Sequence, residues 1–403
     1  MKILMVTPYL PYPPESGGQI RTLNLLKYLR NSHKITLISL YKNDEEKKYA
    51  AHLESFCSKI YLCKRPEKPW QINILAKAIF TLKPLLIVRN FSIEARDLLE
   101  KLLQKEKFDV IHAETFYVMP HLPKTKLPIL LVEQTIEYKV YQHFVDNLLV
   151  FLRPFFYADI LKLNYWERYY WKKASTVATV SQHDKEIIRK VEPKINPVII
   201  PNGAGDEMFA KTLPQKRLNK PILLFIGNFY WLQNKEAASY LVNKILPLLN
   251  KYLTHFKVVI AGQEAKKLKF KKIKNLEIIN FEPEDNNIVK SLYQGATLFI
   301  APIYGPGGTR LKILASMAAG LPVVSTKTGI EGLDIKDNIH VLVAKSPQDF
   351  IEKIKKILAD KKLYEKLQKN SYIKVKETYS WDTISKKLEI VYKTIKQNNE
   401  NRN

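Results

Sequence analysis

The sequence lacks any long apolar run. None of its hydrophobic stretches approaches the roughly 20 residues that a helix needs to cross a bilayer. The first apolar segment, Lys2 to Val6, is too short for the core of a secretion signal. Hydrophobic residues still make up 46% of the 403 residues, which is a globular balance. We therefore expect a protein kept in the cytoplasm, with any membrane contact peripheral and on the inner face of the plasma membrane.

Cysteines and metal-binding motifs are also scarce. Cys57 and Cys63 stand far from any His/Cys cluster with metal-ligand spacing, and a reducing compartment does not favour a disulfide between them. The chain contains no Asp-Xaa-Asp motif. We expect no metal and no cofactor, so that basic side chains would take the place of a divalent ion beside any phosphate.

Acidic residues are few relative to basic ones. There are 39 Asp and Glu against 65 Lys and Arg, which gives a net charge of +26. Such a surplus indicates either nucleic acid or an anionic membrane surface as a partner. No helix-turn-helix, zinc-finger or RNA-recognition signature is present, so we expect no nucleic acid and a possible membrane contact. Most of the charge is Lys in a chain rich in Ile and Asn, and an AT-biased genome explains that equally well.

Strands and helices alternate along the chain. Lys2 to Thr7 reads as a buried strand, a loop with Gly17 and Gly18 follows, and leucines at helical spacing lead to a second strand at residues 34–38. This order is typical of a doubly wound parallel sheet, in which ligands bind at the carboxyl ends of the strands. A second alternation begins at residue 222, after the basic, Pro-containing stretch 211–220, which is the best candidate for a linker. The fold class predicted is α/β.

The segment from Leu298 to Thr326 carries the most chemistry. It reads as a strand, a glycine turn at residues 305–308, a helix that Gly320 can cap, and a second strand at residues 321–325. This is a βαβ unit.

The turn of this unit predicts an anion site. Gly307 and Gly308 let the backbone approach a ligand, and the helix expected to start near Thr309 directs unpaired amides at it. Arg310 and Lys312 add fixed positive charge. A glycine turn before a helix is ordinary by itself, but two cations at a helix N-terminus oppose its dipole and are less expected without an anion.

These residues carry a resemblance. G-G-T-R-L-K-I-L-A-S-M-A-A-G-L-P-V-V-S-T at residues 307–326, with G-I-E-G-L at residues 329–333, resembles the donor-binding segment of the retaining glycosyltransferases of family 4. Residues 1–21 are similar to the first strand and glycine loop of these enzymes. V-S-Q-H-D at 180–184 and I-I-P-N-G at 199–203 match two further landmarks. Each motif is weak alone, but their order and spacing together are specific.

The resemblance implies the GT-B architecture. It consists of two Rossmann-like, doubly wound parallel-sheet domains that face each other across a cleft. Residues 1–205 would form the acceptor-binding domain and residues 206–379 the donor-binding domain. The helix 380–397 would pack back on the first domain, with residues 379–381 as a hinge.

The resemblance also implies which residues act. Arg310 and Lys312 would stabilise the departing diphosphate, and His112, at the end of a strand, would lie near the reacting sugar, although a lone His there is more often structural. The donor-binding residues implied are Gly17, Gly18, Asn202, Gly227, Asn228, Phe281, Gly307, Gly308, Thr309, Arg310, Leu311 and Lys312.

Four residues depart from the usual pattern. Asn228 stands where relatives commonly have an Arg, as in a branch whose charges move to the G-G-T-R-L-K turn. Gln134 and Thr135 replace a common His-Asn pair. Ala315 replaces a glutamate that commonly binds the ribose hydroxyls, a loss that Ser316 or a water could offset and that could also mark an inactive protein.

The most aromatic stretch, residues 148–173, interleaves aromatic and basic side chains. Such a helix can lie in a membrane interface, or it can be a core helix of the first domain. Both descriptions can hold for different faces.

We therefore predict a glycosyltransferase that moves a sugar from a nucleotide-diphosphate sugar to a glycan or lipid-linked acceptor with retention of configuration. Cell-surface polysaccharide or glycoconjugate synthesis is the expected setting. Two alternatives stay open: a catalytically silent nucleotide-sugar-binding protein and a nucleotide-sugar 2-epimerase.

Overall fold

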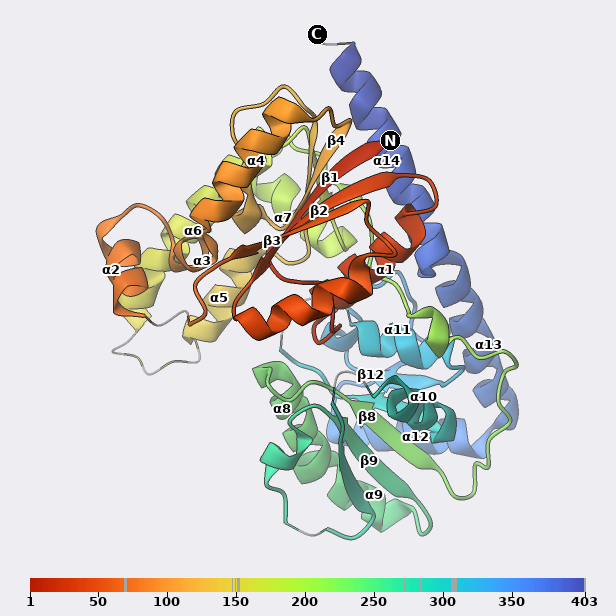
Figure 1. Cartoon of the computed structure of the whole chain (residues 1–403). Coiled ribbons are helices and arrows are strands. Elements are labelled where there is room, and N and C mark those ends of the chain that lie inside the picture. The colour runs from red at the N-terminus through yellow and green to blue at the C-terminus, as the bar shows by residue number, and fades with distance from the viewer. Residues whose placement is uncertain are drawn as a thin grey trace. The chain divides into compact units, whose positions relative to one another are not determined.

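The computed structural model describes residues 1–68, 71–146, 148, 150, 153–271, 273–282, 285–305 and 310–401. They form two compact units (Figure 1). The first comprises Met1–Pro201 and Ser385–Asn403, and the second comprises Asn202–Ile384. The division therefore falls at Pro201, and residues 211–220, expected as a linker, lie inside the second unit.

Seven parallel strands form the sheet of the first unit, in the order β3-β2-β1-β4-β5-β6-β7. β1 (Lys2–Thr7) is central, and its five residues after Lys2 are buried, as expected of a strand with both faces covered. The remaining strands are β2 (Lys34–Tyr41), β3 (Lys59–Lys64), β4 (Val110–Glu114), β5 (Ile129–Glu133), β6 (Thr176–Thr179) and β7 (Val198–Ile199).

Helices connect these strands. They are α1 (Gly17–Leu29), the 3-10 helix η1 (Asp44–Leu53), α2 (Ile72–Phe80), α3 (Leu85–Asn90), α4 (Ile93–Lys105), η2 (Phe116–His121), α5 (Glu137–Asp146), α6 (Arg153–Lys173) and α7 (Gln182–Val191). The last helix, α14 (Trp381–Glu400), contributes to this unit from Ser385 onward. Its residues Leu388, Tyr392 and Ile395 are buried.

Six parallel strands form the second sheet, in the order β10-β9-β8-β11-β12-β13. The strands are β8 (Ile222–Ile226), β9 (Lys257–Gly262), β10 (Leu276–Asn280), β11 (Leu298–Ala301), β12 (Val323–Ser325) and β13 (Leu342–Val343). The helices are η4 (Asp206–Met208), α8 (Leu232–Tyr240), the π-helical turn η5 (Leu241–Ile245), α9 (Leu246–Tyr252), η6 (Ala265–Leu268), α10 (Asn286–Gly295), α11 (Leu311–Ala318), η7 (Thr328–Ile330), α12 (Pro347–Ala359) and α13 (Lys361–Thr378).

The α/β fold class with two parallel sheets is confirmed. In each sheet the strand order reverses beside a central strand, between β1 and β4 in the first unit and between β8 and β11 in the second. Ligands of such sheets bind outside the carboxyl ends of the strands at this reversal. The residues that follow β8 and β11 are therefore the first place to look for a site.

The sequence also predicts a helix over residues 44–60 and a helical region over residues 69–103, and the structure gives these and one other expected helix different bounds. The helix expected over residues 44–60 is the 3-10 helix η1, which ends at Leu53. The helical region expected over residues 69–103 contains three helices, because Pro84 precedes α3 and Ser92 caps α4 by accepting from the amide of Ala95 at 3.2 Å. Within the expected helix 148–173, α6 begins at Arg153.

Candidate donor site and its surroundings

α11 starts the candidate anion site of the second unit. It begins at Leu311, two residues after the expected start, and ends at Ala318, and Gly320, with a φ of 73°, caps it as expected. The amide of Gly320 donates to Met317 at 3.0 Å and that of Leu321 to Ser316 at 2.9 Å, the two bonds of a Schellman cap. The predicted donor-binding residues Gly307, Gly308 and Thr309 lie outside the described residues.

Arg310 is a buried cation directly before α11, only 7% exposed. Its Nη2 donates to the carbonyl of Gly305 at 2.7 Å, whereas its Nε is buried and has no hydrogen-bond partner among the described residues. Burial lowers the pKa of Arg310 to about 10, and the charge of Glu331 acts weakly against that shift. The guanidinium thus has a desolvated donor that no described residue satisfies.

Lys312 is the second cation of the site. Its Nζ donates to the Oδ1 of Asn234 and lies 5.2 Å from the centre of the Phe225 ring. Burial, helped by the charge of Arg310, lowers the pKa of Lys312 to about 7. In the described part of the chain, neither Arg310 nor Lys312 forms a salt bridge with a carboxylate.

The loop after β8 holds Lys312 in place through Asn234. The Nδ2 of Asn234 donates to the carbonyl of Asn228 at 2.7 Å, so one carboxamide joins this loop to α11. The Asn228 side chain is used within the loop: its Nδ2 donates to Gln263 at 2.6 Å and its Oδ1 accepts from the amide of Tyr230 at 2.9 Å. The structure thus brings the expected Asn228 and Lys312 into one site through Asn234, which we did not predict.

Two glycines let the backbone pack closely beside this loop. A Cβ on Gly227 would lie 3.1 Å from the Asn234 side chain, and one on Gly262, whose φ is 151°, would lie 1.8 Å from the carbonyl oxygen of Gly227. Phe281, expected at the donor, is 7% exposed and belongs to the hydrophobic core of the second unit.

Ala315 stands at the position where relatives commonly have the glutamate implied to bind ribose. Ala315 is partly buried against the core. The hydroxyl of Ser316, which we considered as a replacement, is buried and donates to the carbonyl of Ile313 at 2.8 Å. Ser316 therefore faces into the fold. Asn202, the expected donor contact after β7, is buried at 4% exposure in the second unit.

In the first unit, the glycine loop ends at α1. Ser16 caps α1 by a capping box with Gln19, and Gly17 is the first helical residue. A Cβ on Gly18 would lie 2.0 Å from the hydroxyl of Tyr9 and 2.5 Å from the Oε1 of Gln134. Gly18 is thus required by close packing against these two side chains.

His112 belongs to a buried polar network. Its Nδ1 contacts the hydroxyl of Tyr392 in α14, and its Nε2 lies 3.0 Å from Glu114. The other oxygen of Glu114 accepts from Gln134 at 2.7 Å. His112 is fully buried and both of its ring nitrogens are engaged, so its catalytic role stays a prediction, and the structure shows it first as a residue that orients Glu114.

Arg21 completes this network. Its Nε lies 3.6 Å from Glu114, and its Nη1 donates at 3.0 Å to the carbonyls of both Ile200 and Pro201. Burial alone would raise the pKa of Glu114, but the charge of Arg21 and the hydrogen bond of His112 lower it to about 2. Glu114 is therefore a buried carboxylate that stays ionised. Arg21, Glu114 and Tyr392 have no local sequence signal that marks them.

Comparisons with known proteins identify the chain. A family profile described as Glycosyltransferase Family 4 matches residues 16–207, and one described as Glycosyl transferases group 1 matches residues 220–360. The chain belongs to glycosyltransferase family 4. The family prediction is thereby confirmed, and the protein is a glycosyltransferase.

Relatives of this glycosyltransferase are distant. An uncharacterised 44.6 kDa protein in the cps region of Klebsiella pneumoniae is 24% identical over 85% of this chain and 87% of its own length. An uncharacterised glycosyltransferase of Methanocaldococcus jannaschii is 26% identical over 54% of this chain and 59% of its own length.

Solved structures share the fold. A sucrose-phosphate synthase from Thermosynechococcus elongatus has a TM-score of 0.72 at 14% identity, over 98% of this chain and 99% of its own. Anabaena HepE in complex with UDP and glucose has a TM-score of 0.65 at 12% identity, over 98% of this chain and 100% of its own. A glycosyltransferase from Rickettsia africae has a TM-score of 0.64 at 17% identity, covering 98% of both chains.

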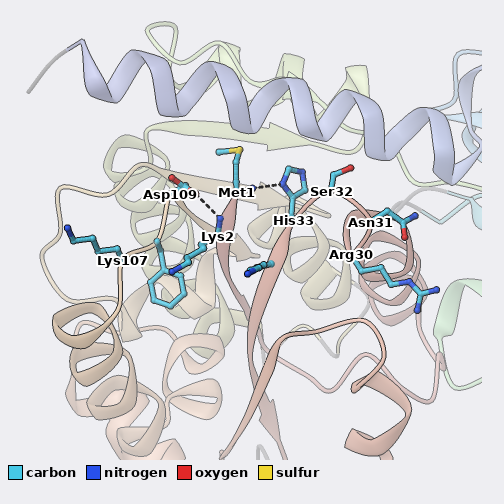
Figure 2. A pocket seen from close by; sticks show the side chains of 10 residues that line it. Met1, Lys2, Arg30, Asn31, Ser32, His33, Lys107 and Asp109 are labelled. Carbon is cyan, nitrogen blue, oxygen red and sulfur yellow. Dashed lines mark hydrogen bonds between the residues drawn. The ribbon is translucent and has the colours of Figure 1, made fainter.

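A surface pocket of the glycosyltransferase lies elsewhere. Figure 2 shows it at the amino-terminal ends of β1 and β2, where the amide of Lys2 donates to Asp109 at 2.7 Å and the terminal amine of Met1 lies 3.4 Å from the Nδ1 of His33. None of the predicted site residues lines it. Because sites of doubly wound sheets follow the carboxyl ends of the strands, we do not assign the reaction to this pocket.

Proposed function

We propose that this glycosyltransferase binds a nucleotide-diphosphate sugar in its second unit, at the carboxyl ends of β8 and β11. The observation that carries the proposal is the pair of buried cations, Arg310 and Lys312, which lack a carboxylate partner among the described residues. A desolvated cation is costly unless an anion compensates it. A diphosphate would supply two negative charges at this point.

The same pair supports a metal-independent mechanism. Departure of the diphosphate from the sugar develops negative charge on the leaving oxygens, and preorganised cations and helix amides stabilise such charge. Arg310 would do this with its Nε, which has no partner in the described ranges, and Lys312 with its ammonium, beside the first amides of α11. We propose that no metal ion is needed, and that addition of EDTA leaves the transfer rate unchanged.

The acceptor and the stereochemical outcome of the transfer are inferred from the family resemblance and from relatives. The family resemblance supports transfer with retention of the anomeric configuration, and we assign acceptor binding to the first unit. A relative in the cps region of Klebsiella pneumoniae and the solved complex of TarM with UDP and α-GlcNAc-glycerol support a glycan or lipid-linked acceptor in cell-surface polysaccharide or glycoconjugate synthesis. The corresponding location would be the cytoplasm, at the inner face of the plasma membrane.

Titration calorimetry with UDP, GDP and ADP tests the donor site. We expect one of the three to bind the wild-type protein, and Arg310→Ala to lower its affinity at least tenfold, because a charged hydrogen bond and a buried charge are lost. The matched control is Arg217→Ala, which removes an exposed arginine of the same unit. The proposal fails if none of the nucleotides binds at millimolar concentration, or if both variants bind like the wild type.

A turnover assay separates the two alternatives from this function. A nucleotide-sugar 2-epimerase would release a free epimer without an acceptor, and a silent binding protein would bind nucleotide without turnover on any acceptor. The anomeric configuration of a transferred sugar, determined by NMR of the product, tests retention.

A further inference from the structure

The first unit exposes a cluster of large apolar side chains at α2. Ile72 and Phe80 are each 86% exposed and Leu82 is 83% exposed, the highest values among large hydrophobic residues in the described ranges. Ile79, in the same helix, is 70% exposed. Single hydrophobic residues on a protein surface are ordinary, but four within eleven residues form an apolar patch, and such patches mark interaction sites.

α2 is attached to the unit by only part of its surface. Ile74 and Ala78 pack with Leu85 in a small cluster of their own, separate from the main core of the unit. Nothing in that cluster covers the opposite side of the helix. The fold therefore uses one face of α2 and leaves the Ile72, Ile79 and Phe80 side chains outward.

Polar bonds from α6 hold the end of α2 in this position. The Nζ of Lys162 donates to the carbonyls of Ala78 at 2.7 Å and Thr81 at 2.8 Å, and the Nε1 of Trp166 donates to the carbonyl of Leu82 at 2.8 Å. These bonds satisfy carbonyls at the C-terminal end of the helix. α2 and α6 thus form one surface, as the adjacent ribbons in Figure 1 show.

α6 extends the apolar surface. Tyr157, Leu161, Tyr165 and Tyr169 follow at intervals of four residues, which places them along one side of the helix, and they are 37%, 72%, 63% and 38% exposed. The opposite side, with Leu163 and Trp171, is buried in the core. The inner side of this aromatic helix therefore belongs to the core, as one of the two interpretations of residues 148–173 expects. Its outer side is an exposed stripe of mostly aromatic side chains.

Basic residues predominate beside α2, whereas the hydroxyl of Tyr157 in α6 donates to the carboxylate of Asp146. From residue 68 to residue 93 the sequence has four basic residues and no Asp or Glu, and Lys77 and Lys83 are exposed beside the apolar tips. At the end of α6, Lys172 forms a salt bridge with Glu192 at 2.8 Å, and the exposed Lys173 lies 5.5 Å from the centre of the Tyr169 ring. Apolar tips bordered by tyrosines and lysines match the layering of an anionic bilayer surface, where rings lie at headgroup depth and lysines meet lipid phosphates. A second copy of this surface would bring like charges together.

We propose that Ile72, Ile79, Phe80, Leu82, Leu161 and Tyr165 form a membrane-contact surface that inserts α2 into the headgroup region of a bilayer containing anionic lipid. The proposal deepens the proposed function, since a lipid-linked acceptor would lie in that bilayer. No helix in the described part of the chain is long and apolar enough to cross it, so the contact is interfacial.

Vesicle sedimentation tests this surface. The full chain is mixed with phosphatidylcholine vesicles that contain about a third phosphatidylglycerol, or with vesicles of pure phosphatidylcholine. We expect the wild type to sediment with the anionic vesicles and at least tenfold less with the neutral ones, and the triple variant Ile79→Ser, Phe80→Ser, Leu82→Ser to lose at least tenfold in partitioning. A matched control is Ile373→Ser with Ile390→Ser, two residues that are 40% and 63% exposed on other helices.

A second variant keeps the test valid if the triple variant unfolds. Lys77→Glu with Lys83→Glu leaves the apolar tips in place, and it should weaken binding to the anionic vesicles and reduce its salt dependence. The proposal is overturned if the wild type binds neither vesicle, or if the folded variants bind like the wild type. It is also overturned if sedimentation velocity shows a wild-type dimer that the triple variant lacks, because the occupant would then be a second copy.

Nucleotide titration without vesicles separates this proposal from the proposed function. The triple variant should bind nucleotide like the wild type. If the triple variant loses vesicle binding but still binds nucleotide, the membrane-contact surface is supported. If the wild type binds vesicles but no nucleotide, only the proposed donor site is contradicted.

Discussion

The ammonium of Lys312 donates to the side-chain oxygen of Asn234, and the amide nitrogen of the same Asn234 donates to the carbonyl of Asn228. A neutral carboxamide is thus the polar neighbour of a buried cation. Because Asn cannot neutralise the ammonium, the charge is oriented, and no carboxylate of the described residues forms a salt bridge with it. Several measurable consequences of this arrangement concern the donor site.

Donor binding should be linked to proton uptake. The pKa of Lys312 is lowered to about 7 in the free protein, and a bound diphosphate would raise it. Above pH 7 the complex then holds more protons than the free protein, so affinity falls as pH rises, by up to about tenfold per unit. Calorimetry with a nucleotide sugar at pH 8, in buffers of different ionisation enthalpy, measures the uptake.

Lys312→Arg is the control for this linkage. A guanidinium keeps the positive charge but does not titrate in this range, so proton uptake should disappear. Identical heats for the wild type in the two buffers would contradict the assignment of Lys312 to the diphosphate.

The effect of replacing Asn234 on nucleotide affinity should depend on the charge of the new side chain. Asn234→Ala removes one neutral hydrogen-bond partner of Lys312, and we expect about a two- to tenfold loss of nucleotide affinity. Asn234→Asp places a carboxylate in the position of the anion, so the loss should exceed tenfold. Asn243→Asp, an exposed residue of the following turn, should leave affinity unchanged. If the Asn234→Asp variant binds as tightly as the wild type, the diphosphate does not reach Lys312.

The ionised Glu114 should make the fold sensitive to acid. Its folded pKa of about 2 lies below the unfolded value of about 4.3, so its contribution to stability is present above that value and is lost as pH falls toward 2. Glu114→Gln removes the carboxylate beside the buried Arg21, which we expect to lower the free energy of unfolding by about 3–5 kcal/mol. Urea unfolding at pH 7, 4 and 3 should show a flatter pH dependence for this variant than for the exposed control Glu54→Gln. Equal dependence in both variants would argue that Glu114 is not the acid-sensitive group.

Two glycines of the second unit form a matched pair. Gly262 has a φ of 151° and its missing Cβ would lie 1.8 Å from the carbonyl oxygen of Gly227, whereas a Cβ on Gly295 would meet nothing within 4 Å. Gly262→Ala should therefore destabilise the unit by more than about 2 kcal/mol and disturb the Gly227 loop, while Gly295→Ala, at the end of α10, should be neutral or slightly stabilising. Thermal unfolding of both variants checks this, and equal melting temperatures would show that the backbone relaxes around Gly262.

Local patterns predicted the fold well. Lys2–Thr7 is a strand with the ends expected, because a strand buried on both faces needs a continuous apolar run. Gly320 was expected to end a helix because few other residues adopt a positive φ there. Strands and helix ends that depend on neighbouring residues in the sequence could therefore be predicted.

The site was predictable only in part. Arg310 and Lys312 stand next to a glycine turn and were found from it. Asn234 contacts Lys312 across 78 residues, and Tyr392 contacts His112 across 280 residues. Such pairs depend on how distant elements pack, and neither residue has a distinctive neighbour pattern. The same holds for α2, whose sequence is apolar but does not reveal which side the unit covers.

The membership of α14 in the first unit has a consequence for biosynthesis. Residues 1–201 leave the ribosome long before Leu388, Tyr392 and Ile395, although these three complete the buried interior of the same unit. When only residues 1–201 have left the ribosome, His112 therefore lacks its partner Tyr392. The apolar surface that α14 covers in the finished unit is then still exposed. The first unit therefore begins folding before the second, and its interior is completed only after the second unit has been synthesised.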